Sequence, residues 1–313
     1  MNSNNHFKTS IGGSALIEGV MMRGPDTTAM AVRKSDGTVD LSTWETNPNG
    51  KKKPWYKTTP LVRGIFNFVD SMVVSYKCLM KSADLSDLDE TENEIGFEKW
   101  LHDKLGDRFG KAIGMMAMAL GIVLAIGLFM VLPTVIISLL KPMFTAKWLL
   151  SLVEAVVKIG IFVAYLFAVS RTPDIRRVFE YHGAEHKTIA CYEAGEALTA
   201  QNIAKFSRFH PRCGTSFILI VLIVSVLVFS WVTWSSVLMR IMLKLICLPL
   251  VVGIAYEIIK LSGRYDNLIT RIVSAPGLWL QRLTTREPDD QQIEVAIASM
   301  EPCIPQADGA DRW

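Results

Sequence analysis

Two histidines and a glutamate fall within the short segment His182-Gly183-Ala184-Glu185-His186. On a helix, His182 and His186 stand one turn apart on the same face, which suits two imidazoles that bind one Zn²⁺. Glu185 then lies beside the metal. In the H-x-x-E-H order this glutamate is the usual general base, acting on a water whose pKa the metal lowers to about 7. Two surface histidines flanking an acid would give the same five-residue pattern, so the motif alone leaves both interpretations open.

A second pair of metal-binding residue types, His210 and Cys213, follows in the same region of the chain. Their three-residue separation is typical of a zinc half-site, and Pro211 and Gly214 favour a turn that aims both side chains inward. The two pairs together could supply four ligands to one tetrahedral site. The alternative is that Cys213 is a small buried residue at a helix start and His210 a hydrogen-bonded histidine at a membrane boundary.

Composition indicates an integral membrane protein, because half of the residues are hydrophobic and the mean hydropathy is +0.29. Four stretches are long enough to cross about 30 Å of hydrocarbon. Pro133 is expected to kink the first of them near its far end. The predicted transmembrane helices cover residues 113–140, 148–170, 215–237 and 241–259.

Lysine and arginine crowd the segment before the first predicted span, the loop after the second and the tail after the fourth. The positive-inside rule therefore places both termini and the 171–214 loop in the cytoplasm. The histidine cluster is then cytosolic. Because that compartment is reducing, no disulfide framework is expected among the five cysteines. These are Cys78, Cys191, Cys213, Cys247 and Cys303.

The predicted topology brings the start of the third span and the end of the fourth to the same membrane boundary. Cys213 precedes the third span, and Glu257 lies at the end of the fourth. A carboxylate from a separate helix is the usual third ligand of a catalytic two-histidine site, so Glu257 is a candidate ligand. Tyr256 and Glu257 could equally form an interfacial anchor, with Glu257 paired to Lys260.

Charged residues also occur inside the predicted spans. Glu154 and Lys158 are four residues apart on one helical face, which favours an ion pair, and Lys244 sits near the outer end of the fourth span. A proton or ion path is one interpretation, but snorkelling or helix packing is favoured because these residues lie near the outer interface. A transporter would show charges or helix breaks at the midplane of several spans.

Residues 1–59 are predicted to form a small β-rich cytosolic unit. The turn Ser35-Asp36-Gly37 lies between two short apolar segments and is typical of a hairpin. The glycines of an earlier apolar stretch, residues 11–25, imply tight turns or close backbone approach. Glu18 and Arg23 in that stretch could reach the metal site, although a structural ion pair between them is the simpler expectation.

Two further segments are amphipathic. Residues 60–112 contain a predicted helix over 60–83 and an acidic linker over 84–98. Residues 260–313 contain a predicted interfacial helix over 268–283. The tail from Asp289 is expected to begin with a short helix and then to be disordered.

Several of these motifs together resemble the bacterial YqhQ-like family, a group defined by a domain of unknown function. The resemblance covers roughly residues 8 to 290 and implies a metal-dependent protein of the bacterial cytoplasmic membrane. It adds weight to His182, Glu185, His186, His210, Cys213 and Glu257 as a functional set, and to Glu18 and Arg23, but it implies no reaction. The motifs that carry it are Ile11-Gly12-Gly13, the segment from Glu18 to Pro25, the segment from Tyr181 to Lys187, the segment from His210 to Ser216, and Tyr256-Glu257.

The predicted fold is therefore a mostly α membrane protein with four transmembrane helices, amphipathic helices and a small β-rich N-terminal unit. The domain boundaries are 1–59, 60–112, 113–170 for the first two spans, 171–214 for the cytosolic loop, 215–259 for the last two spans, and 260–313.

Two functions remain open. The first is a metal-dependent hydrolase, such as a peptidase, with zinc or another divalent transition metal held by His182, His186 and a third ligand, Glu257 or His210, and with Glu185 as base. The second is a non-enzymatic scaffold in which His182, His186, His210 and Cys213 close a structural zinc site that braces a docking platform for a membrane or cytosolic protein. A net charge of +3 is too small to indicate nucleic-acid binding, so the lipid bilayer is the expected surface.

Overall fold

A four-stranded antiparallel sheet begins the part of the chain that the computed structural model describes. The strands follow one another as a meander in the order β1-β2-β3-β4. Residues 34–38 form the predicted hairpin turn between β3 and β4, and Gly37 there has a φ of +84° that favours glycine. The strand bounds are β1 Gly12–Leu16, β2 Gly19–Arg23, β3 Thr27–Arg33 and β4 Val39–Glu45. The described residues are 7–47, 54–86, 107–143, 147–231, 236–265, 267–307 and 309–312.

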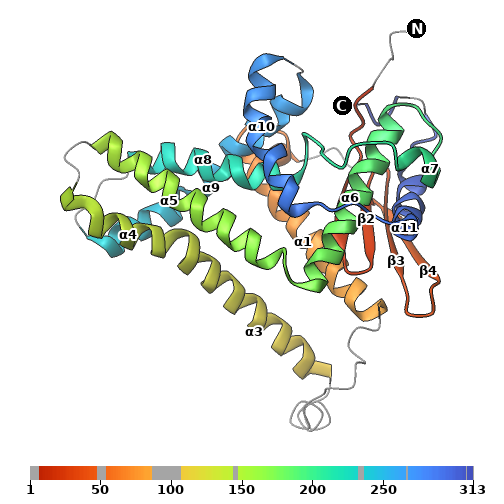
Figure 1. The fold of residues 1–313 in the computed structure, drawn as a ribbon, viewed down its shortest axis with the longest axis horizontal. Coiled ribbons are helices and arrows are strands. Elements are labelled where there is room, and N and C mark those ends of the chain that lie inside the picture. Colours follow the sequence, from red (N-terminus) through yellow and green to blue (C-terminus); the bar gives the residue numbers. More distant parts are fainter. Residues whose placement is uncertain are drawn as a thin grey trace. The chain divides into compact units, whose positions relative to one another are not determined.

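The described residues divide into two units, each of which has its own packing. The first unit comprises residues 1–87, 165–221 and 249–313, and the second comprises residues 88–164 and 222–248. The sheet belongs to the first unit, together with α6 (Pro173–Glu193) and α11 (Asp290–Met300), which lie beside the strands in Figure 1.

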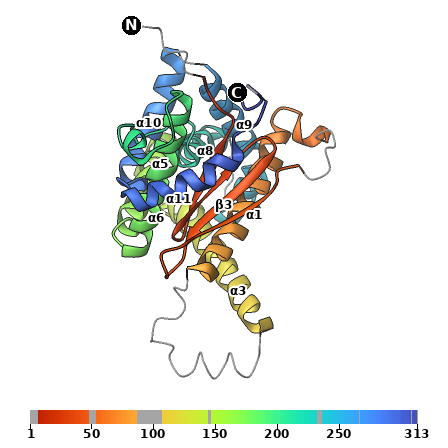
Figure 2. The same ribbon diagram turned by 90° about the vertical axis from the view of Figure 1, so that its right-hand side faces the viewer.

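Both faces of the sheet are covered, because successive side chains of a strand point to opposite sides. Val20 and Met22 of β2 pack with α6 and α11 on one face. Met21, between them, packs on the other face with Cys78 of α1 (Val62–Leu85). Figure 2 shows α11 lying across the strands. The sheet therefore fixes the position of α6, the helix that carries the histidine motif.

The short helix expected after Asp289 is present as α11, but the described residues that follow it pack on the protein, so the disorder expected there is wrong. Ile293 and Met300 of α11 are fully buried against the sheet, and Cys303 follows in a short 3-10 helix, Glu301–Cys303. Further along, the hydroxyl of Thr9 donates a 2.5 Å hydrogen bond to the buried carboxylate of Asp311. The tail contributes apolar side chains at helical spacing to the main core, and that burial offsets the entropy of ordering it.

Three described stretches are long and apolar enough to cross a membrane, namely Met118–Met143, Leu152–Val169 and Ile241–Arg264. They belong to α3 (Asp107–Ile126) with its continuation, to α5 (Lys147–Val169) and to α9 (Val237–Arg264). The remaining predicted span corresponds to α8 (Gly214–Ser230), which is apolar but has only 17 residues. The prediction of a helical protein with membrane-length segments is thus confirmed for three segments.

Pro133 lies where the first of these stretches changes its helical register. The helix passes from α3 through a π-helical turn, Gly127–Val131, into α4, Leu132–Leu140, and then into a 3-10 turn, Lys141–Met143. A wide turn before a proline accommodates the ring and the missing N–H, which explains the local change. The helical pattern thus changes next to Pro133, while the kink itself stays a prediction.

The two predicted amphipathic helices are present as α1 and as α10 (Leu268–Thr284). A single turn, Trp55–Lys57, precedes α1, and a short helix, Ala200–Ile203 (α7), follows α6. The acidic segment that was predicted to be a linker lies, after Ser86, outside the described residues. The five cysteines are free, and all but Cys247 are buried.

Three charged residues of the apolar helices, Glu154, Lys158 and Lys244, form a buried cluster in the second unit. Glu154 of α5 accepts from Lys244 of α9 at 2.5 Å and lies 3.2 Å from Lys158. The ammonium of Lys244 also donates to the Thr134 hydroxyl at 3.1 Å, and both lysines lie over the ring of Phe229. The predicted Glu154–Lys158 pair is confirmed, and Lys244 joins it from a different helix.

This cluster holds two ammonium groups against one carboxylate, so its members are expected to differ in importance. Glu154→Gln should destabilise the protein by roughly 3 kcal/mol, because it removes the buried carboxylate that both ammonium groups contact. Lys158→Met should cost less, because it leaves the Glu154–Lys244 pair intact. Thermal unfolding of both variants in one detergent checks this order, and equal losses would show that the carboxylate is not the centre of the cluster.

Candidate metal centre

The histidine motif lies on α6, and the helix places its side chains as the spacing predicts. Pro173 starts the helix at a position where its missing N–H costs nothing. The rings of His182 and His186 stand one turn apart with their centroids separated by 4.4 Å. Residues 183–189 are buried against the sheet and the segments that follow, so the motif faces the interior of the first unit.

Cys213 completes a group of three metal-ligand atoms. One such atom from each of His182, His186 and Cys213 lies within 4.8 Å of the other two. The Cys213 sulfur is 3.2 Å from His182 Nε2. Cys213 immediately precedes α8, whose first residues direct it toward α6. Among the described residues this is the one group of three or more that could hold a metal ion.

Both imidazoles are oriented by backbone carbonyls. His182 Nδ1 lies 2.8 Å from the carbonyl oxygen of Thr284, and His186 Nδ1 lies 2.6 Å from that of Arg208. With Nδ1 as the donor in each case, Nε2 carries the lone pair in the neutral form of each ring. This is how metal-binding histidines are held in proteins, because the second hydrogen bond fixes both the tautomer and the ring orientation.

Charge is concentrated in this buried group. Burial alone would raise the pKa of the Cys213 thiol, but His182, His186 and their hydrogen bonds hold it well below its usual range. Burial would lower the pKa of His182, yet the Cys213 thiolate and Glu185 raise it to about 9. In the protein without metal, the two groups therefore form a thiolate–imidazolium pair. The amide and the hydroxyl of Thr215 lie within hydrogen-bond distance of the sulfur.

Glu185 is buried beside these groups. Only 5% of it is exposed, and burial raises the pKa of its carboxyl, although the two histidines counteract this effect. A Gly13 backbone hydrogen bond also favours the ionised form. A Cβ at Gly13 would lie 3.0 Å from the Glu185 carboxyl carbon and 2.6 Å from the Met21 carbonyl oxygen. The close approach expected of the N-terminal glycines thus occurs at the candidate site itself.

Two comparisons with known proteins cover most of this chain. A family model described as protein of unknown function (DUF1385) matches residues 59–306. The chain belongs to that family. It is also 33% identical over 292 residues to an uncharacterized protein, YqhQ of Bacillus subtilis (strain 168), covering 92% of this chain and 90% of that protein. The resemblance to YqhQ-like proteins is thus confirmed, and no solved structure matches the chain.

Membership of the DUF1385 family indicates neither a reaction nor a bound metal. The matched region contains His182, His186 and Cys213, together with Thr284 and Arg208, whose carbonyls orient the two histidines. Gly13 and Glu18 precede the matched region. The case for a metal centre therefore rests on the geometry of these side chains.

His210 lies next to the cluster but is engaged elsewhere. Its ring centroid is 5.5 Å from that of His186, while its Nε2 lies 3.6 Å from a Glu193 oxygen and 3.3 Å from Arg212. Gln281 accepts from the backbone N–H of His210 and donates to its carbonyl, both at 2.8 Å. Burial lowers the pKa of His210, so this ring is neutral at neutral pH. The structure uses it in a polar network rather than as a fourth ligand.

Three other candidate residues are not part of the cluster. Glu257 accepts from the guanidinium of Arg63 at 2.8 Å and from the backbone N–H of Leu61. This places it in an ion pair with α1, which sequence reasoning did not identify because Arg63 is 194 residues away. Arg23 ends β2 and is not one of the three grouped ligands.

Glu18 supports the motif helix from the sheet. Its carboxylate binds Arg177 in a two-pronged ion pair and accepts from the hydroxyl of Tyr181, the residue before His182. Glu18 itself has a φ of +51° in the tight turn between β1 and β2. The expected ion pair between Glu18 and Arg23 is thus replaced by one with α6, and Glu18 positions the helix that carries the histidines.

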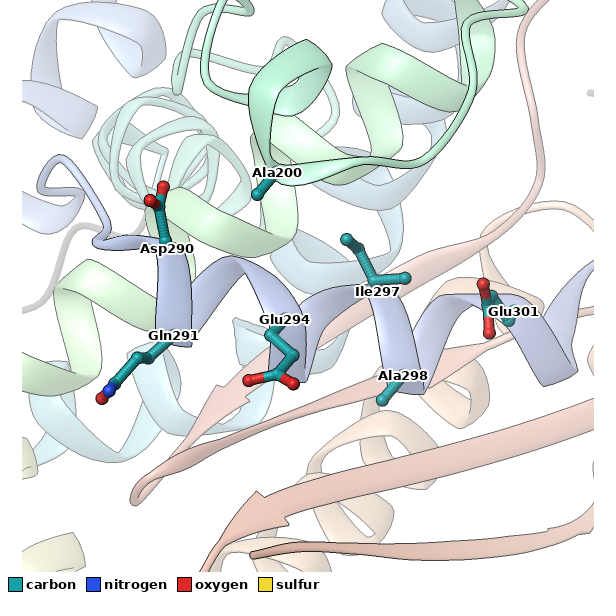
Figure 3. Close-up of a pocket in the computed structure, with 7 residues that line it drawn as sticks. All are labelled: Ala200, Asp290, Gln291, Glu294, Ile297, Ala298 and Glu301. Atoms are coloured by element: carbon teal, nitrogen blue, oxygen red, sulfur yellow. The ribbon is translucent and has the colours of Figure 1, made fainter. Parts of the chain in front are cut away.

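A surface hollow on the outer side of α11 has no comparable chemistry. Figure 3 shows its lining, in which acidic side chains project around a small apolar patch at Ile297 and Ala298. Glu294 in this hollow pairs with Arg33 of the sheet. The lining has no histidine or cysteine, so the candidate metal ligands remain those of α6 and Cys213.

The thiolate–imidazolium pair can be tested in metal-free protein. His182 should keep its proton until the pH approaches 9, whereas a free histidine loses it near 6.5. Cys213→Ser should lower the pKa of His182, because burial would remain while the thiolate that raises the pKa would be gone. NMR titration of histidine-labelled protein, with His182 assigned by substitution, measures both values. An unchanged titration in Cys213→Ser would contradict the pairing.

Proposed function

We propose that this chain is a metal-dependent membrane hydrolase, with Zn²⁺ or another divalent transition metal held by His182, His186 and Cys213. The observation that carries the proposal is the convergence of these three ligand atoms within 4.8 Å, with the carboxyl of Glu185 buried beside them. Three protein ligands leave a coordination position open, which is the arrangement of catalytic rather than structural zinc sites.

The residues present fit a metal of this class. Imidazole and thiolate are the donors that zinc prefers, and the low pKa of Cys213 supplies the thiolate form that a metal ligand requires. The carbonyls of Thr284 and Arg208 fix His182 and His186 with Nε2 available. The ion would replace the proton that His182 otherwise carries, and its charge would be balanced by the thiolate and Glu185.

A bound metal of this kind would supply a water acidified to near neutral pH and would polarise a carbonyl oxygen. Glu185 would be the side chain that takes part in the reaction beside the metal, and the pKa of its buried carboxyl is raised from its ordinary value. Such a shift suits a general base, because its pKa then lies closer to the working pH. The backbone of Gly13 holds the carboxyl in place through a hydrogen bond to its ionised form.

The cellular setting that we propose is a bacterial cytoplasmic membrane with both termini in the cytosol. Three helices of spanning length support it, and α8, which starts directly after Cys213, would serve as the fourth span. The cluster would then lie at the cytosolic boundary of the bilayer. A site in that place suits an amide bond in a membrane-borne protein, so peptidase activity is the reaction that we favour.

Metal content gives the first test. We expect about one equivalent of zinc in detergent-purified protein, lost in His182→Ala and in Cys213→Ser, because each removes one of three ligands. His210→Ala and Glu257→Gln should retain it, because both residues are engaged elsewhere. Elemental mass spectrometry measures all five proteins. Loss of zinc in His210→Ala with retention in Cys213→Ser would overturn the ligand set.

A second candidate function is supported by the burial of the cluster. His186 and Cys213 are almost fully buried, and His210 lies beside His186, so a shift of His210 would close a four-ligand structural site. In that case the metal would stabilise the first unit, and that unit would bind a membrane or cytosolic protein. Glu185 would then stabilise the ligand side chains without binding the metal itself. The two functions differ in whether a coordination position is open.

Cobalt substitution distinguishes them. An open site loaded with Co²⁺ should change its visible spectrum when azide is added, whereas a closed site should not. Glu185→Gln should keep the cobalt spectrum but slow cleavage of a reconstituted membrane-peptide library by about 100-fold or more. Mass spectrometry of the products reports cleavage. No azide response together with unchanged products would support the structural site instead.

A further inference from the structure

Helix α10 has its polar and apolar faces reversed relative to a helix on the surface of a water-soluble protein. The face that packs on the rest of the first unit carries Gln281 and Thr284, both essentially fully buried, together with Ser274 and Gly277, and Leu280 is its one large apolar residue that is fully buried. The outward face carries large apolar side chains, with 74% of Leu268, 72% of Ile269, 63% of Ile272 and 54% of Trp279 exposed. Water is an unfavourable solvent for that outward face.

The position of α10 along the chain indicates what covers this face. α9, one of the three helices of spanning length, ends at Arg264, and α10 begins at Leu268. A capping box between Asn267 and Thr270 fixes the start of α10 directly after this short connection. A helix that begins so close to the end of a span begins at the surface of the bilayer.

The side chains around this junction match the interfacial layer of a membrane. Exposed Leu261 and Tyr265 extend the apolar surface from the end of α9, and the guanidinium of Arg264 lies over the Tyr265 ring. Arg271 and Arg282 are exposed on α10 itself. Tyrosine and tryptophan concentrate at headgroup level, and arginines there attract anionic lipid.

The buried face of α10 contacts the segments that carry the candidate metal centre. The carbonyl of Thr284 orients His182, and Gln281 binds the backbone of His210 on both sides. Gln281 also donates to Ser216, and a Cβ at Gly277 would lie 2.3 Å from the hydroxyl oxygen of that serine. The helix therefore joins α6 to the segment that carries Cys213.

We propose that α10 lies in the interfacial layer of an anionic bilayer and that this lipid contact holds the histidine and cysteine segments in register. Lipid contact is independent of the proposed function, whereas control of metal binding by that contact rests on it. Removal of the bilayer leaves the apolar face in water or detergent, loosens α10, and with it the carbonyl that orients His182.

Photocrosslinking tests the lipid contact without any metal. The full chain carries a photoreactive residue at Ile272, or at Gln291 on the exposed side of α11 as the control, in nanodiscs of phosphatidylethanolamine and phosphatidylglycerol. We expect lipid adducts from position 272 and at least tenfold fewer from position 291. Adducts to a second protein chain, or equal lipid labelling at both positions, would overturn the proposal.

Hydrogen exchange tests the connection to the site. The double substitution Ile269→Ser and Ile272→Ser changes only exposed side chains, and Leu41→Ser, on the exposed side of β4, is the matched control. In the same nanodiscs the double variant should exchange at least tenfold faster than wild type over residues 208–216 and 281–286, while the control should not. Unchanged exchange in the double variant would show that lipid contact does not hold these segments.

Zinc affinity then separates this proposal from the proposed function. If the wild type binds zinc, the double variant should bind it at least tenfold more weakly in nanodiscs, whereas the control should match wild type. Zinc binding of equal strength in all three proteins would support the metal centre but would overturn the proposal that lipid contact controls metal binding. Lipid adducts at position 272 in a protein that binds no zinc would refute the metal centre alone.

Discussion

Helix α6 depends on two backbone approaches that leave no room for a Cβ. A Cβ at Gly183 would lie 1.9 Å from the carbonyl oxygen of Arg286, which belongs to the segment that follows α10. On another side, Gly13 of β1 lies against the carboxyl of Glu185. The amide of Arg286 donates to the carbonyl of Phe179, so the crossing segment is hydrogen-bonded to the helix that it touches. Any larger side chain would push these backbones apart, and interiors at protein density have little space to absorb that.

These contacts explain why the pKa values of the side chains in the cluster are shifted from their ordinary values. With the sheet, α10 and the Cys213 segment packed tightly around α6, water is largely excluded from the two histidines, the thiol and Glu185. Interactions between charges are stronger in such a place than at a surface, and an unpaired charge is costly. His182 and Cys213 offset that cost by ionising together. The same close packing that orients the ligands thus also prepares the thiolate that a metal requires.

Sequence reasoning recovered the parts of this arrangement that depend on local spacing. The one-turn separation of His182 and His186, the hairpin at Gly37 and the amphipathic helices α1 and α10 follow from helical or strand periodicity. It did not recover features that depend on long-range pairing, such as the engagement of Glu257 by Arg63 or the turning of His210 toward Glu193. The short helix after Asp289 was expected, but its burial and the packing of the residues that follow it were not, because the polar composition of the tail concealed a few apolar residues at helical spacing. Their partner is the sheet at the other end of the chain.

The order of these segments along the chain constrains when the site can form. His182 and His186 come first, Cys213 comes next at the start of an apolar helix, and Thr284 comes only after α9, a helix of spanning length. The ring of His182 therefore lacks its orienting carbonyl until α9 has been made and α10 has packed onto α6. Because a preformed site is what gives a metal ion its affinity, capture of the metal proposed for this chain would follow completion of the apolar helices. The membrane part and the candidate centre are thus linked through the path of the chain as well as through α10.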